Sequence, residues 1–253
     1  MRIVVTRPAA QADDWVRDLQ AQGLDAAALP LIGIAPAHDA GALDAEWQAI
    51  AQRRLVVFVS PNAVQHFFVR RPAGVSWPAP TWAASPGPGT TRALLALGVP
   101  AARIIEPAAD APQFDSESLW LQLARHDWHD ASVLVVRGDG GRDWLADTLR
   151  EHGAQVAHVA AYRRALPELD AHARALLASA LDAPARHVWL FSSSEAVANL
   201  AALAPAQTDW QAGRAIGTHP RIVAKARQQG FGDVAAARPS LAAVVACIQS
   251  FRP

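Results

Sequence analysis

The amino-acid sequence predicts an α/β fold with two similar lobes, each a parallel sheet flanked by helices. Short apolar runs rich in β-branched residues recur along the chain, and each is followed by a small or polar turn and then by apolar residues at helical spacing. The order of these units in the first half of the chain returns in the second half. Continuous apolar strands that alternate with helices are typical of parallel sheets covered on both faces.

In the first half of the chain, residues 3–5 form the first predicted strand. A helix follows it and ends at Gly23, because glycine is the usual residue just past a helix end. Residues 55–59 form the next predicted strand, which leads into a serine-containing turn and a helical pattern. A weaker strand at 81–84 leads into a glycine-containing turn and a helix that ends at Gly98.

The second half shows the same succession. Residues 133–136 form a predicted strand, and a glycine-rich turn and a helix that stops at Gly153 follow it. Residues 188–191 form another strand before a run of serines. A weaker strand at 214–216 precedes a turn and a helix that ends at Gly230.

The chain contains a long internal repeat. Residues 7 to 23 run from an arginine to a glycine, as do residues 137 to 153, at an offset of 130. Four positions recur at an offset of 133, where Phe58, Ser60, Ala63 and Val64 return as Phe191, Ser193, Ala196 and Val197. Because a third pair of turns, at Gly87 and Gly217, follows in the same order, we infer a duplicated α/β domain with a ligand cleft between its lobes.

The composition excludes several classes of protein. Lys+Arg and Asp+Glu each number 23, so the formal net charge is zero and a protein that coats nucleic acid is not expected. The single cysteine, Cys247, excludes an internal disulfide and a cysteine-rich metal site. The single lysine, Lys225, lies between alanines, so the chain has no P-loop and a Schiff-base lysine is not expected.

The hydropathy pattern predicts a packed protein of the cytoplasm. Apolar residues make up 51% of the chain and charged residues 18%, which favours a packed core over disorder. The first apolar run, at residues 3–5, is only three residues long and is soon followed by Arg7 and Pro8, so no secretory signal is expected. No run approaches the roughly 18 apolar residues of a membrane span, so no membrane contact is expected.

A glycine-rich turn follows the strand at 133–136 and precedes a helix. Backbone N–H groups in such a turn and at a helix N-terminus bind anions. The turn fails the dinucleotide fingerprint because Asp143 occupies the third glycine position. A flexible turn without a ligand is the plainer interpretation. We predict ligand contact through Arg137, Gly138, Asp139, Gly140, Gly141 and Arg142.

Serine, threonine and glycine residues occupy the other strand-to-helix turns. Such residues cap helices as a matter of course, and the same hydroxyl and N–H groups are able to hold carboxylates. No Gly-x-Ser-x-Gly motif is present in the serine turns, so a serine hydrolase is not expected. The candidate residues are Ser60, Pro61, Asn62, Ala63, Gly87, Gly89 and Thr90 in the first half, and Ser192, Ser193, Gly217, Thr218 and His219 in the second.

Tyr162 is the only tyrosine, and it follows the apolar run at 156–161. One interpretation is a half-buried strand aromatic near a linker; the other is a phenol at the mouth of the cleft that donates a proton. His126 and His129 are spaced as metal ligands, but no third ligand motif stands nearby. We therefore expect a solvated helix end there and no metal.

Seven segments in this order give the sequence a resemblance to the uroporphyrinogen-III synthase family. They span nearly the whole chain, and the ordered set is more specific than any one of its members. The segments are Val5-Thr6-Arg7-Pro8, Leu29-Pro30-Leu31, Phe58-Val59-Ser60-Pro61-Asn62-Ala63-Val64, Gly87-Pro88-Gly89-Thr90, Val136-Arg137-Gly138-Asp139-Gly140-Gly141-Arg142, Ala161-Tyr162-Arg163 and Phe191-Ser192-Ser193.

The resemblance implies two α/β lobes joined by two strand-like connectors, with an interleaved layout that the repeat does not show. Residues 1–37 and 164–253 would form one lobe, and residues 38–163 the other. The best linker candidates in the sequence lie at 36–42 and 164–170.

The resemblance also implies a reaction. Hydroxymethylbilane, a linear tetrapyrrole with eight carboxylates, would lose its terminal hydroxyl as water and close with inversion of ring D through a spiro-pyrrolenine intermediate. No metal or organic cofactor takes part in the family. Tyr162 matches the tyrosine that assists departure of the hydroxyl, and Thr90 and Ser193 match further family positions. Pro220 departs from the pattern, because the family often has a threonine there.

A polycarboxylate needs many anion-binding groups, and strand-to-helix turns supply them without a cofactor. Thr6 and the arginines Arg7, Arg137 and Arg142 would add to the turns. We expect a monomer in transient contact with the enzyme that makes hydroxymethylbilane. The alternative is a two-lobed binding protein for an anionic small molecule, although such receptors are normally exported. A Rossmann-type redox enzyme is disfavoured by the failed fingerprint.

Overall fold

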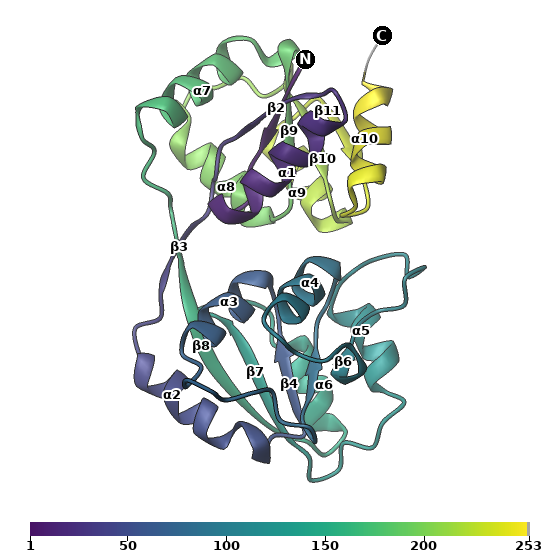
Figure 1. The fold of residues 1–253 in the computed structure, drawn as a ribbon. Coiled ribbons are helices and arrows are strands. Elements are labelled where there is room, and N and C mark those ends of the chain that lie inside the picture. The colour runs from purple at the N-terminus through teal and green to yellow at the C-terminus, as the bar shows by residue number, and fades with distance from the viewer. Residues whose placement is uncertain (252–253) are drawn as a thin grey trace. The chain divides into compact units, whose positions relative to one another are not determined.

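A computed structural model describes residues 1–251 of the chain (Figure 1). Two compact units are present, and each is described by itself. Unit 1 contains residues 1–33 and the chain from Ala165 onward, and unit 2 contains residues 34–164. The chain therefore enters unit 2 once and leaves it once.

Unit 1 is built on a five-stranded, fully parallel sheet with the order β11-β10-β9-β1-β2. Apolar residues of β1 and β9, such as Ile3 and Val188, pack against α1 and α10. The strands are β1 (Arg2–Val5), β2 (Asp25–Ala28), β9 (His187–Phe191), β10 (Arg214–Gly217) and β11 (Asp233–Ala236). The helices are α1 (Ala9–Ala21), α7 (Ala171–Asp182), α8 (Ser194–Leu203), α9 (Pro220–Gln229) and α10 (Leu241–Ser250), with a short 3-10 turn at Pro184–Arg186.

Unit 2 is built on a six-stranded sheet with the order β3-β8-β7-β4-β5-β6. Its strands are β3 (Gly33–Pro36), β4 (Leu55–Phe58), β5 (Trp82–Ala84), β6 (Ile104–Ile105), β7 (Ser132–Gly138) and β8 (Gln155–Ala165). Its helices are α2 (Ala40–Ala49), α3 (Pro61–Val69), α4 (Pro88–Ala96), α5 (Ser116–Leu123) and α6 (Trp144–Glu151), with 3-10 turns at Ile50–Gln52 and Ala101–Arg103.

The two faces of the unit 2 sheet carry separate apolar cores. Val56 and Phe58 of β4 face α2, α3 and α4, whereas Leu55 and Val57 face α5 and α6. This alternation follows from the two-residue period of a strand. Because both faces are covered, β4 and β7 consist almost entirely of buried apolar residues, as the sequence predicts for parallel strands.

Each unit takes strands from both copies of the sequence repeat. Val5 pairs with Leu190 in unit 1, and Val57 pairs with Val135 in unit 2. The repeat offsets of 130 and 133 turn Val5 into Val135 and Val57 into Leu190, so these two pairs are equivalent. The prediction of two similar lobes is confirmed, but neither lobe is one copy of the repeat.

Sheet register also corrects one alignment of the repeat. Trp82 pairs with Leu55, and Arg214 pairs with Val188. Since Val188 is the repeat counterpart of Leu55, Arg214 is the counterpart of Trp82, and Gly87 corresponds to His219 rather than to Gly217. The helix ends agree, because Gly87 and His219 both stand at N-caps that a proline follows.

The connections between the units are β3 and β8, which neighbour each other in the unit 2 sheet. Arg163 Nε donates a hydrogen bond of 3.1 Å to the Pro36 carbonyl oxygen and ties the two strands together. Residues 34–37 and Arg164, which the sequence-based layout places with the first lobe, therefore belong with unit 2 in the structure.

Candidate functional site

The predicted ligand-binding turns follow the carboxyl ends of six strands. In unit 1 they follow β1, β9 and β10, and in unit 2 they follow β4, β5 and β7. Neighbouring strands among these are parallel, so the three turns of each unit lie at one edge of its sheet. Ligands of open α/β sheets bind at this edge.

Tyr162 lies inside unit 2 with no exposed surface, on the face of β8 that meets Phe58 and Phe67. Its hydroxyl oxygen lies 3.0 Å from Ser60 Oγ and accepts a hydrogen bond of 3.2 Å from Arg164 Nη2. Tyr162 is therefore fully buried within unit 2, and the interpretation as a half-buried strand aromatic is wrong. The cause is a partner 102 residues away in the chain, which closes over the hydroxyl.

Gly138 leaves the space that the tyrosine ring fills. A Cβ atom at Gly138 would lie 3.0 Å from both Cε2 and Cζ of Tyr162, which is tighter than most real Cβ contacts. The pairing of β7 with β8 shifts register between Arg137 and Gly138, so that Gly138 faces Tyr162 directly. The backbone N–H of Asp139 then donates to the Tyr162 carbonyl oxygen at 3.1 Å. The glycine is thus a packing requirement as well as part of the turn.

His66 of α3 packs near the same ring, with centroids 5.8 Å apart. Burial lowers the pKa of the His66 imidazole, because the charged form loses its hydration. The imidazole is therefore neutral near pH 7, and its neighbour Tyr162 sits among uncharged groups on that side.

Both arginines of the glycine-rich turn form ion pairs with carboxylates of unit 2. Arg137 pairs with Asp143 and also donates to the Gly141 carbonyl oxygen at 3.1 Å. Its hydrogen bond and charge hold the pKa of the Asp143 carboxyl below its usual range. Arg142 makes a bidentate ion pair with Glu117 of α5, with N···O distances of 2.7 and 3.1 Å. To bind a ligand in place of these partners, each guanidinium would have to give up one of its present hydrogen bonds.

Two details of this turn differ from the sequence-based expectation. The helix α6 begins at Trp144, so residues 139–143 form a loop and only its last residues adjoin the helix N-terminus. The Asp139 carboxylate accepts a hydrogen bond of 3.2 Å from the Arg164 backbone N–H. It fixes the loop against β8 and repels anions, so it is unsuited to hold a carboxylate.

The other unit 2 turns begin helices as predicted. Ser60 caps α3, because its Oγ accepts a hydrogen bond of 3.2 Å from the Ala63 N–H. Pro61 is the first residue of that helix, and Asn62 and Ala63 are buried in its first turn. Gly89 lies beside Pro61, since a Cβ on it would be 3.6 Å from Pro61 Cγ, so the α3 and α4 turns are neighbours.

Thr90 is buried and its N–H donates to the Gly87 carbonyl oxygen at 3.0 Å. The exposed residue of this turn is Pro88 rather than Thr90. A chain of hydroxyls beneath it, from Ser85 through Thr91 to Glu106, fixes the turn with hydrogen bonds of 2.7 and 2.6 Å. Sequence reasoning did not single out Ser85 or Glu106.

In unit 1, most of the candidate binding residues make hydrogen bonds or close contacts within the sheet and its helices. Thr6 is fully buried and its Oγ1 donates to the Leu190 carbonyl oxygen at 2.8 Å. Thr218 is buried too, and its N–H donates to the Phe191 carbonyl oxygen at 3.1 Å. Gly217 allows α9 to approach, because a Cβ there would lie 2.8 Å from Val223 Cγ2. The structure thus gives these three residues packing roles.

The remaining unit 1 candidates stand at helix N-termini. Ser193 caps α8 by accepting from the Glu195 N–H at 3.1 Å, and Ser192 beside it is half-buried. His219 caps α9 through Nδ1, which accepts from the Arg221 N–H at 3.1 Å. Arg7 stacks on Trp15 of α1, with Cζ 4.8 Å from the ring centroid. Together with the unit 2 turns at Ser60 and Gly87, the turns at Ser193 and His219 place helix N-termini at the carboxyl ends of the strands.

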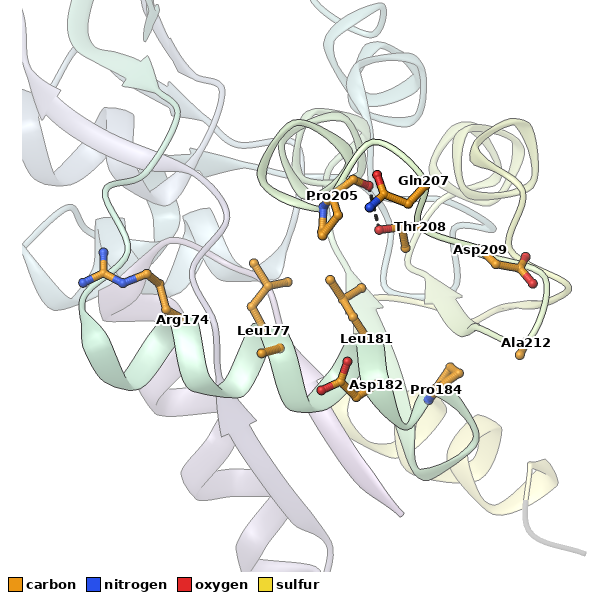
Figure 2. A pocket seen from close by; sticks show the side chains of 11 residues that line it. Arg174, Leu177, Leu181, Asp182, Pro184, Pro205, Gln207, Thr208, Asp209 and Ala212 are labelled. Carbon is orange, nitrogen blue, oxygen red and sulfur yellow. Dashed lines mark hydrogen bonds between the residues drawn. The ribbon is translucent and has the colours of Figure 1, made fainter.

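An open hollow in unit 1 is separate from these turns (Figure 2). It lies between α7 and the loop after α8, with Leu177 and Leu181 on one side and Pro205 on the other. These segments precede β9 and β10, so the hollow is at the amino ends of the strands. The turns are at the carboxyl ends, on the opposite edge of the same sheet.

Within residues 1–251, no group of three or more His, Cys, Asp and Glu side chains is arranged to hold a metal ion. In the same part of the chain, no helix has the length and apolar character needed to span a membrane. His129, one of the histidines considered above, instead pairs through Nδ1 with Asp130 at 3.1 Å.

Comparison with known proteins gives the family. The family model described as uroporphyrinogen-III synthase HemD matches residues 13–246. The chain belongs to the uroporphyrinogen-III synthase family. Its members are enzymes of tetrapyrrole biosynthesis, and the sequence-based resemblance is confirmed.

Individual relatives agree with the family. The uroporphyrinogen-III synthase of Salmonella typhimurium is 32% identical over 174 residues, which cover 67% of this chain and 68% of the relative. That of Proteus mirabilis is 28% identical over 167 residues, covering 65% and 80%. Among solved structures, a uroporphyrinogen-III synthetase from Helicobacter pylori matches with TM-score 0.61, 17% identity and full coverage of both chains. A uroporphyrinogen III synthase from Thermus thermophilus matches with TM-score 0.59, 16% identity and 99% and 98% coverage. The structural matches show the same fold.

Proposed function

We propose that this protein converts hydroxymethylbilane to uroporphyrinogen III, with loss of water and inversion of ring D. The observation that carries this is the family match over residues 13–246, which includes every turn at the carboxyl edge of unit 2. The reaction makes the enzyme a cyclising hydro-lyase. It involves no net oxidation or reduction, so it needs no redox cofactor, and we propose that it runs without any cofactor or metal.

Helix N-termini are the proposed carboxylate sites. α3, α4, α8 and α9 each begin directly after a strand, at the N-caps Ser60, Gly87, Ser193 and His219. The positive end of each helix dipole favours a carboxylate there. These four N-termini, two in each unit, are the proposed binding positions for substrate carboxylates, although the formal net charge of the protein is zero.

We propose that Tyr162 assists departure of the substrate hydroxyl. A departing hydroxide needs a proton, and a phenol held by Arg164 is able to give one because the guanidinium stabilises the negative oxygen that remains. We propose that orientation decides which isomer forms. The turns hold the reactive intermediate so that the macrocycle closes with ring D inverted rather than in its original orientation.

A cytoplasmic location, a monomeric state and transient contact with the enzyme that makes hydroxymethylbilane complete the proposal. The intermediate closes spontaneously in water, so direct delivery would be an advantage. The second candidate is a binding protein for an anionic small molecule, which the helix N-termini alone would also support.

Multiple turnover separates the two candidates. The dialysed protein, supplied with hydroxymethylbilane in the presence of a metal chelator, is expected to form many equivalents of cyclic product per equivalent of protein. A binding protein would hold one equivalent and leave the spontaneous rate unchanged or slower. Loss of activity in chelator, restored by one metal, would contradict the cofactor-free part of the proposal.

A further inference from the structure

The buried Tyr162 hydroxyl reaches a ligand only through a neighbour. The residue has no exposed surface, whereas Ser60, 3.0 Å away, is half-buried and Arg164 is exposed. If Tyr162 supplies a proton, as the proposed function requires, one of the two groups that touch its hydroxyl must stand between it and the substrate. Arg164 carries only donors and cannot accept a proton, so Ser60 is the candidate.

The hydrogen bonds around Ser60 give the direction of transfer. Arg164 donates to Tyr162 Oη, and Ser60 Oγ, 3.0 Å away, is positioned to accept the phenol's own proton. Ser60 Oγ also accepts from the Ala63 N–H at 3.2 Å. A serine hydroxyl has two acceptor positions and one donor, so when Tyr162 donates to Ser60 both acceptor positions are filled and the Ser60 proton is available to a further acceptor. Each bond in such a chain polarises the next.

We propose that Ser60 is the hydroxyl that touches the substrate, and that it relays the proton of Tyr162 to the departing oxygen. The inference rests on the proposed function and deepens it. The carbon–oxygen bond of the hydroxymethyl group breaks and both of its electrons leave with the oxygen. That oxygen takes the Ser60 proton and departs as water, while Ser60 takes the proton of Tyr162.

The step leaves a phenolate beside Arg164 and a carbocation delocalised onto the pyrrole nitrogen. When the macrocycle closes, the new ring carbon sheds a proton, and Ser60 returns that proton to Tyr162. The residues end as they began, and the net change is the loss of one water. Arg164 is a positioning residue in this scheme, because it orients the phenol and stabilises its charge without touching the leaving group.

The repeat confines this relay to unit 2. Ser193 is the counterpart of Ser60 and caps α8 in the same manner. The position 130 residues before Tyr162 is Ile32, and the chain has no second tyrosine. The two serines therefore share a capping role, and only Ser60 has a phenol behind it. The proposed relay therefore uses residues of unit 2 alone.

The test compares Ser60→Ala, Ser60→Thr, Tyr162→Phe and the Ser60→Ala/Tyr162→Phe double variant on enzymatically made hydroxymethylbilane. We expect Ser60→Ala and Tyr162→Phe each to lower kcat by about tenfold or more. KM should stay within about twofold, because the relay acts in the transition state. The double variant should be no slower than the slower single variant, since both substitutions break one relay. Ser60→Thr keeps the hydroxyl and should restore most of the rate.

Solvent isotope effects give a readout that a purely structural role would not move. In mixtures of light and heavy water, the wild-type single-turnover rate should depend on deuterium fraction with the curvature of two protons in transit. Ser60→Thr should keep that curvature. Ser240→Ala is the matched control, because Ser240 caps α10 through the Ala243 N–H and has no assigned role in the site. It should lose a helix cap and keep kcat.

Several results would overturn the relay. These are full kcat in Ser60→Ala, effects of the two single substitutions that multiply in the double variant, a Ser60→Thr variant as slow as Ser60→Ala, or a linear one-proton dependence in the wild type. Each leaves the proposed function intact if the wild type still forms the type III isomer. A wild-type protein that forms no type III isomer overturns the function and the relay together.

Discussion

Arg137 must exchange partners before it holds a substrate carboxylate. In the structure its guanidinium is bound to Asp143 and to the Gly141 carbonyl oxygen, and 16% of its side chain is exposed. The sequence places Arg137 at this turn but does not predict its ion pair with Asp143. In the sequence, Asp143 is notable only because it occupies a position where the dinucleotide-binding motif has a glycine. If Arg137 binds a substrate carboxylate, as we propose, the Asp143 carboxylate competes with the substrate for the same guanidinium.

Asp143→Asn is therefore expected to lower KM for hydroxymethylbilane, and Arg137→Ala is expected to raise it. The asparagine removes the competing charge, and the alanine removes the cation itself. Steady-state kinetics of the two variants check this. An unchanged KM in both variants would show that Arg137 serves the loop and not the substrate. In Arg137→Ala, the pKa of the Asp143 carboxyl should also return upward toward its ordinary value, as a carboxyl titration by NMR would show.

Gly138→Ala tests the packing that holds the tyrosine. The new methyl would lie 3.0 Å from two ring atoms of Tyr162 and 3.3 Å from its hydroxyl oxygen, so the ring must move. We expect a stability loss of about 1–3 kcal/mol from overpacking and a fall in kcat larger than that loss explains, because the hydroxyl shifts away from Ser60. Gly140→Ala is the stability control, since nothing lies within 4 Å of its added carbon. Full kcat in a folded Gly138→Ala variant would contradict a role for the placement of the ring.

At the scale of elements, buried strands and the turns after them are the predictable part. β1, β4, β7 and β9 are continuous apolar runs because both faces of each sheet are covered. The strands β2, β6 and β11 are short, alanine-containing or at a sheet edge, so they leave little signal in the sequence. Capping serines show in the sequence where helices begin. The sequence does not show which serine hydroxyls also form hydrogen bonds with residues far along the chain, as Ser60 does with Tyr162.

The proline-rich segment at 71–80 illustrates the same limit. It is predictable as a loop, but its Trp77 is buried and stacks on Phe68 of α3 at 5.9 Å. Trp47 of α2 joins this aromatic cluster, with its ring 4.8 Å from that of Phe67 and its Nε1 bonded to the Phe67 carbonyl oxygen at 2.7 Å. Side-chain contacts between an isolated loop tryptophan and a distant helix have no periodic pattern that would reveal them.

Trp47→Ala is expected to destabilise unit 2 by about 3–5 kcal/mol, because it opens a cavity and leaves the Phe67 carbonyl without its indole partner. Chemical denaturation followed by circular dichroism measures the loss. Trp144→Ala is the matched control, because Trp144 is 38% exposed and should cost clearly less. Equal losses in the two variants would contradict the assignment of the cluster as the anchor of α2.

At the scale of the whole molecule, the repeat predicts two similar lobes and not the exchange of strands between its copies. The reason is that equivalent residues have equivalent neighbours whether the strands pair within one copy of the repeat or between the two copies. Val5 faces Leu190 and Val57 faces Val135, and each pair would look the same in the sequence if the copies paired within themselves. Only the three-dimensional pairing shows that unit 1 needs both ends of the chain, while unit 2 is one continuous segment.

A fragment of residues 34–164 is therefore expected to fold alone, with one cooperative thermal transition, since it contains both cores of unit 2. The control is a fragment from residue 165 onward, which lacks β1 and β2 and should not fold by itself. Circular dichroism and amide NMR spectra distinguish the cases. A disordered 34–164 fragment would show that unit 2 depends on unit 1 for its stability.

The isomer of the product tests the account most directly. The purified protein is given freshly made hydroxymethylbilane, and the cyclic products are oxidised and separated as type I and type III uroporphyrins. Spontaneous closure gives type I, without inversion of ring D. The account predicts that type III dominates and that its share grows with protein concentration. Only type I at every protein concentration would contradict the assignment of this chain to ring closure with inversion.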